Sequence, residues 1–61
     1  MSWEEIISFV PGDLVLKAKG LHAGQTGIVI EVHTNRLGNT ILTVLADRSV
    51  VKWYSNMVSL L

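Results

Sequence analysis

Two histidines, His22 and His33, are the side chains of this chain best suited to acid–base chemistry near neutral pH. Catalysis would need a nucleophile or a carboxylate spaced to form a relay with one imidazole, and a structural zinc site would need cysteine or more histidine. The chain has no cysteine, and neither histidine has a neighbour at such a spacing. We therefore expect two ordinary histidines, no metal, no cofactor, and a chain that is not an enzyme.

The basic residues indicate a second kind of chemistry, the neutralisation of nucleic-acid phosphates. They could share one face if the hairpin tips approach the first strand, with Trp53 or Tyr54 stacking on a base. They are dispersed, however, and five acids balance the five bases to a formal charge of zero. An RNA- or DNA-binding face is thus an alternative to a solvated rim. Its members would be Lys17, Lys19, Arg36, Arg48 and Lys52.

The size and composition of the chain favour association. Its 61 residues are enough for one domain, over residues 1–61. A domain this small buries roughly 60% of its unfolded surface and is marginally stable alone. Disulfides cannot help, and with 49% apolar and 16% charged residues the surface has little charge to keep copies apart. Extra stability should come from an efficient core or from self-association, so a homo-oligomer is expected.

The N-terminus does not resemble a targeting signal. Met1-Ser2-Trp3-Glu4-Glu5 carries acids where a secretory signal carries bases, and no apolar run approaches the length of about 20 residues that spans a bilayer. We expect a cytoplasmic protein without membrane association.

The first ten residues have a helical spacing of apolar side chains. Those at positions i, i+3, i+4 and i+7 are Trp3, Ile6, Ile7 and Val10. Ser2 and Glu5 are spaced as a capping box, and Pro11 ends the helical region. We expect a short helical turn within residues 1–10. It could cover an open end of the domain, dock on a partner, or be a disordered arm.

The rest of the chain has the pattern of short strands separated by turns. We expect strands over residues 14–19, 26–34, 40–45 and 49–54, and a turn followed by a last short strand within residues 57–61. The loop over residues 35–39 and the two-residue turn Asp47-Arg48 join consecutive strands, and Asp13 should accept hydrogen bonds from amides of the preceding turn. Strands at intervals of about ten residues predict an all-β, five-stranded antiparallel barrel over residues 11–61.

Two motifs give this pattern a resemblance. Pro11-Gly12-Asp13-Leu14-Val15 matches the entry turn, and Gly24-Gln25-Thr26-Gly27-Ile28-Val29 the glycine arch, of SH3-like barrels of the KOW type. The resemblance implies structural roles for Pro11, Gly12, Asp13, Gly24 and Gly27. Gly27 would permit a bulge or a close approach between strands.

The chain departs from that family where nucleic-acid binding would be encoded. The arch Gly20-Leu21-His22-Ala23-Gly24-Gln25 lacks the lysines and arginines of nucleic-acid-binding members, and Arg48 replaces the glycine expected after Asp47. A non-glycine residue at positive φ costs about 1 kcal/mol, so a different turn type is expected there. The chain is also similar to short stand-alone SH3-like proteins of tailed bacteriophages, which implies a host cytoplasm or a virion as its location. Comparable barrels are accessory subunits of larger complexes.

The apolar and aromatic side chains favour protein binding. Several strands are apolar on both faces, yet a small barrel has one interior, so the surplus must be covered by the N-terminal segment, a second copy or another protein. Alternation places Trp53 in the core and Tyr54 outside. Our first hypothesis is therefore a non-enzymatic protein-interaction or assembly module. Its expected contact residues are Trp3, Ile6, Ile7 and Tyr54.

Overall fold

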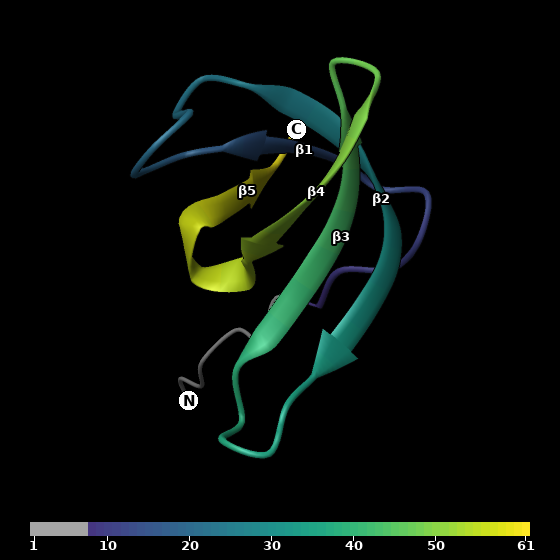
Figure 1. The fold of residues 1–61 in the computed structure, drawn as a ribbon, viewed down its shortest axis with the longest axis vertical. Helices are drawn as coiled ribbons and strands as arrows, with labels where there is room; N and C mark the ends of the chain where they lie inside the picture. Colours follow the sequence, from purple (N-terminus) through teal and green to yellow (C-terminus); the bar gives the residue numbers. More distant parts are fainter. Residues whose placement is uncertain (1–7) are drawn as a thin grey trace, which may run out of the picture.

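A computed structural model describes residues 8–61 and shows an all-β fold (Figure 1). Its elements are the strands β1 (Leu14–Lys17), β2 (Thr26–Thr34), β3 (Thr40–Ala46), β4 (Ser49–Tyr54) and β5 (Val58–Leu60), with a 3₁₀ helix η1 (Ser55–Met57) before β5. Every strand pair is antiparallel, and the order across the sheet is β4-β3-β2-β1-β5. The predicted fold class and number of strands are confirmed.

The sheet curves strongly but does not close (Figure 1). The strands β4 and β5 are its two edges, so the expected closed barrel is not confirmed. η1 connects these edges, and the first strand ends at Lys17 instead of the predicted residue 19. After Lys17, whose carbonyl accepts from the Gly24 amide at 2.8 Å, the chain enters the arch, and the Ala18 amide donates to the Met57 carbonyl of η1 at 2.7 Å.

The start of the described chain is not helical. Residues 8–10 have no regular structure, and the expected contacts of Trp3, Ile6 and Ile7 lie outside the described residues. Phe9 is buried in the core, whereas Val10, which the helical spacing placed on the apolar stripe, is exposed. The Val10 amide donates to the Asp13 carboxylate at 2.9 Å, so this part of the chain belongs to the turn that follows.

That turn matches the expectation for Pro11-Gly12-Asp13. Gly12 has a φ of +101°, which few side chains tolerate, and the Asp13 amide donates to the Val10 carbonyl at 3.1 Å. The predicted role of Asp13 as an acceptor from a turn amide is confirmed. The Gly12 amide also donates to the Val29 carbonyl at 2.8 Å, which fixes the entry turn against β2.

One continuous cluster of apolar side chains fills the inner face of the sheet. Its buried members are Phe9, Val15, Val29, Leu42, Val44, Ala46, Trp53 and Val58. Trp53 is only 5% exposed and Tyr54 is 50% exposed, as the alternation along β4 predicts. The positions that the strand period assigns to the inner face therefore make the core.

A β-bulge at Ile30 adjusts β2 to this core. Val29 is opposite Val44 and Glu31 is opposite Thr43, so Ile30 is an extra residue with no partner on β3. Because of the bulge, Val29 and Val32 both face the core although they are three residues apart. The sequence suggested Gly27 as the place for a bulge, and the bulge lies three residues later.

Gly27 instead serves the other purpose expected of it, a close approach of two strands. A Cβ atom at Gly27 would lie 2.5 Å from Cγ1 of Val44 and 2.7 Å from the carbonyl oxygen of Leu45. No side chain fits there without moving β3. Gly24 closes the preceding arch, because its amide donates to the Lys17 carbonyl at 2.8 Å.

The turn between β3 and β4 differs from the expectation. Asp47 and Arg48 have φ values of +51° and +64°, so both central residues are left-handed, as in a type I′ turn. The absence of glycine did not change the turn type. The twist of the flanking strands favours this turn, and Arg48 adopts a strained backbone to form it.

Candidate protein-binding face

A row of exposed apolar side chains crosses the outer face of the sheet. The strand register places Leu14 opposite Ile28, Ile28 opposite Leu45, and Leu45 opposite Val50. Residues opposite each other in antiparallel strands share a face, so these four side chains are neighbours across four strands. Each is between 43% and 63% exposed. We call Leu14, Ile28, Leu45 and Val50 the apolar belt.

Two further exposed apolar residues adjoin the belt, one after the edge strand β5 and one at the bulge of β2. The Leu61 amide donates to the Leu14 carbonyl at 3.0 Å, which brings the exposed Leu61 next to the belt. Ile30 is exposed beside it at the bulge of β2. Large exposed apolar patches on soluble proteins usually mark sites of interaction, so this group of neighbouring apolar residues indicates a surface that something covers.

The next row of the same face carries charge. Glu31 on β2 is opposite Thr43 on β3, and Thr43 is opposite Lys52 on β4, so an acid and a base flank β3. The row beyond it comprises His33, Ile41 and Tyr54. A shallow depression of about 290 Å³ lies over these rows and is lined by Glu31, His33, Ile41, Thr43 and Lys52.

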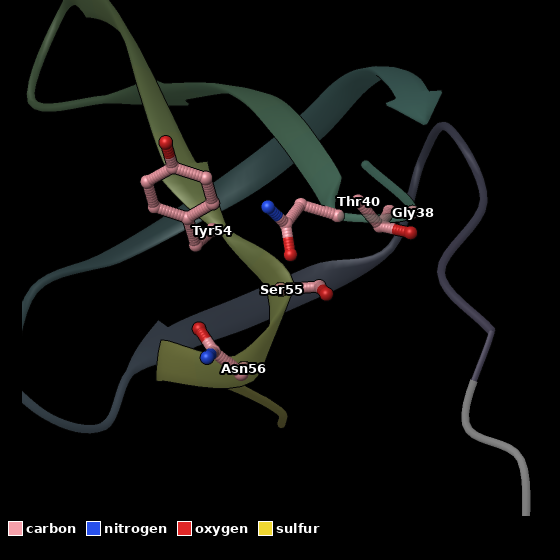
Figure 2. A pocket seen from close by; sticks show the side chains of 6 residues that line it. Gly38, Thr40, Tyr54, Ser55 and Asn56 are labelled. Carbon is pink, nitrogen blue, oxygen red and sulfur yellow. The ribbon is translucent and has the colours of Figure 1, made fainter. Parts of the chain in front are cut away.

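Tyr54 belongs to a second hollow, at the end of β4. This pocket of about 240 Å³ is lined by Gly38, Asn39, Thr40, Tyr54, Ser55 and Asn56. Figure 2 shows Tyr54, Ser55 and Asn56 following each other along the chain, with Gly38 and Thr40 across from them. Its amides and hydroxyls can donate and accept hydrogen bonds, and none of the lining residues carries a charge.

The basic residues expected on a nucleic-acid face are not brought together. Arg36 lies in the loop before β3 and Arg48 in the turn after it, so these two side chains are at opposite ends of one strand. Lys52 is on the outer face of β4, and Lys19 is exposed near the arch. The hairpin tips therefore do not converge on the first strand.

Lys17 is placed differently from the expectation of a solvent-facing base. Its side chain is on the inner face of β1 and is 6% exposed. The ammonium donates to the Leu21 carbonyl at 2.7 Å and lies 5.5 Å from the centre of the Trp53 ring. This lysine fastens the arch to the core and does not present its charge to a ligand in solution.

The two histidines lie apart in the fold. His22 is in the arch with a φ of +68°, and His33 is exposed on the outer face of β2. Within residues 8–61, no group of three or more His, Cys, Asp or Glu side chains is placed to hold a metal ion. In the same part of the chain, no helix has the length and apolarity needed to cross a membrane.

Sequence reasoning found that several strands are apolar on both faces but did not align the residues of the belt. Alternation alone assigns Leu14, Ile28 and Leu45 to the outer face of their own strands. The strand register, which depends on the turns and on the Ile30 bulge, makes them neighbours.

No protein-family model, curated protein or solved structure gives a significant match to this chain.

Proposed function

We propose that this chain is a non-enzymatic protein-association module, and that its binding surface is the outer face of the sheet centred on the apolar belt. The observation that carries the proposal is the alignment of four large apolar side chains across four strands, all of them exposed. Each of these side chains is already about half buried, so covering the rest of one stabilises a complex by about 1 kcal/mol, and a partner gains enough to bind only by covering several.

The rest of the face supports the same function. Charges and hydrogen-bonding groups adjoin the belt, and an apolar centre with a polar rim is the usual composition of a protein interface. Tyr54 lies two rows away and is half exposed, so it can act as an aromatic anchor at the margin. The dispersed positions of Arg36 and Arg48 give less support to the alternative of RNA or DNA binding.

The same proposal includes a fold family and a kind of assembly for this protein. The antiparallel five-stranded sheet, the entry turn at Gly12 and the close approach at Gly27 support an SH3-like barrel of the KOW type. A module of this kind would act as a small subunit of a larger assembly, such as a bacteriophage particle or a cytoplasmic complex.

A comparison of two leucine variants tests the function. Leu45 is at the centre of the belt, whereas Leu37, 84% exposed in the loop between β2 and β3, is away from it. We expect Leu45→Ser to weaken association about tenfold or more, and Leu37→Ser to leave it unchanged. Sedimentation velocity measures self-association, and titration with a purified partner measures hetero-association.

The proposal fails if neither form of association depends on Leu45. Two observations together would give that result. The wild-type chain would stay monomeric to about 1 mM, and it would bind each candidate partner with the same affinity as the Leu45→Ser variant.

A further inference from the structure

We infer that the partner of the outer face is a second copy of this chain, packed face to face about a two-fold axis that runs along β3. This inference rests on the proposed function and names its partner. The feature that carries it is the placement of opposite charges at equal distances on either side of β3. Glu31 is on β2 and Lys52 is on β4, and both are opposite Thr43.

The two-fold axis makes this arrangement self-complementary. A two-fold rotation about an axis parallel to β3 keeps each residue at the same position along the strand direction. It exchanges the strands on either side of β3, so β2 of one copy covers β4 of the other. Glu31 then faces Lys52 of the second copy, and Lys52 faces its Glu31. Both ion pairs form at the same time, and Thr43 of one copy meets Thr43 of the other.

The belt obeys the same symmetry. Leu45 is on β3 and would meet Leu45 of the second copy on the axis, while Ile28 would meet Val50. Apolar residues thus face apolar residues at Ile28, Leu45 and Val50, whereas Leu14 on β1 lies beyond the edge strand β4 of the second copy. A rotation about an axis across the strands would instead place Glu31 on Glu31 and Lys52 on Lys52, which costs free energy.

Three further properties fit a copy of the same chain. The formal charge of the chain is zero, so two copies do not repel each other as a whole. Glu31 and Lys52 are both exposed, and their backbones are about 10 Å apart at the usual strand spacing of about 4.8 Å, so both side chains are accessible to a facing sheet. The depression beside Thr43 has about 290 Å³ of room for the lysine stem of the second copy.

Charge reversal provides the test, with the full chain and sedimentation equilibrium as the measurement. Glu31→Lys should place two bases against each other at both symmetric positions, and Lys52→Glu should place two acids there. We expect each variant to dimerise about tenfold more weakly than the wild type. An equimolar mixture of the two variants should form a heterodimer of near wild-type affinity, because every pair is then of opposite charge.

Cross-linking tests the position of the axis. The chain has no cysteine, so Thr43→Cys introduces a unique thiol on the proposed axis. Facing sheets pack about 10 Å apart, which a short bis-maleimide spans. We expect a covalent dimer from Thr43→Cys and none from Leu37→Cys, whose thiol lies at a hairpin tip. Circular dichroism of each variant verifies that it is folded.

The outcomes separate this inference from the proposed function. A chain that is monomeric to about 1 mM, or a mixture of the charge variants that binds no better than each alone, overturns the two-fold dimer. If the chain stays monomeric while Leu45→Ser weakens the binding of a different purified protein, the proposed function stands and the second copy is excluded. If neither association depends on Leu45, both fail.

Discussion

The ammonium group of Lys17 lies 5.5 Å from the centre of the Trp53 ring. Lys17 is on β1 and Trp53 is on β4, two strands that are not neighbours in the sheet, so this contact crosses the interior. The same ammonium donates to the Leu21 carbonyl of the arch at 2.7 Å. One buried side chain thus connects the first strand, the fourth strand and the arch.

Truncation of Lys17 is expected to destabilise the fold. Lys17→Ala removes a charged hydrogen bond, a cation–π contact and the packing of the stem, for a total of about 3 kcal/mol. Lys17→Met keeps the stem and should cost about 1 kcal/mol. Urea unfolding followed by Trp53 fluorescence, in a Trp3→Phe background, measures both. The exposed Lys19→Met is the control and should change little; a Lys17→Met protein as stable as the wild type would show that the ammonium contacts contribute nothing.

A methyl group at Gly27 should be among the most damaging small changes. Gly27→Ala places a Cβ atom 2.5 Å from Val44 and 2.7 Å from the Leu45 carbonyl, so β3 must shift. We expect a loss of about 3 kcal/mol in the free energy of unfolding. Thr26→Ala, at the exposed neighbouring position, is the matched control. Equal stability of the two variants would contradict the close approach.

Relief of backbone strain at Arg48 should stabilise the protein. Its φ of +64° is unfavourable for a residue with a side chain, and glycine adopts it freely. Arg48→Gly is expected to raise the free energy of unfolding by about 0.5–1 kcal/mol and to raise the melting temperature. Ser49→Gly, in the strand that follows, should do the opposite. A lower melting temperature for Arg48→Gly would argue against a type I′ turn.

The loop between β2 and β3 should depend on the side chain of Asn35. Its Oδ1 atom accepts hydrogen bonds from the amides of Leu37 and Asn39, at 2.9 and 3.0 Å. Asn35→Ala is expected to cost about 1 kcal/mol, whereas Asn35→Asp keeps the acceptor and should cost less. Amide hydrogen exchange at Leu37 and Asn39 is the direct measurement. Unchanged exchange in Asn35→Ala would exclude this role.

Local patterns were sufficient to predict the elements and the environment of single residues. The period of two along β4 predicted a buried Trp53 and an exposed Tyr54, and the turn chemistry of Asp13 predicted its acceptor role. These features depend on residues close together in the sequence, so no long-range information was needed.

Features that depend on distant parts of the chain were not predicted. Lys17 looked like a surface base, because its partners, Leu21 and Trp53, come together only in the folded chain. Phe9 stood outside the helical stripe and was not singled out as a core residue. The apolar belt needed the register of four strands, which the bulge at Ile30 shifts by one residue.

That bulge also affects how this chain should be compared with others. Ile30 has no partner on β3, while Val29 and Glu31 face consecutive residues of that strand. A homologue that lacks one residue at this position would preserve every cross-strand pair and the inward direction of both valines. A single-residue gap in the middle of β2 is therefore compatible with the same fold, although insertions and deletions are ordinarily confined to loops.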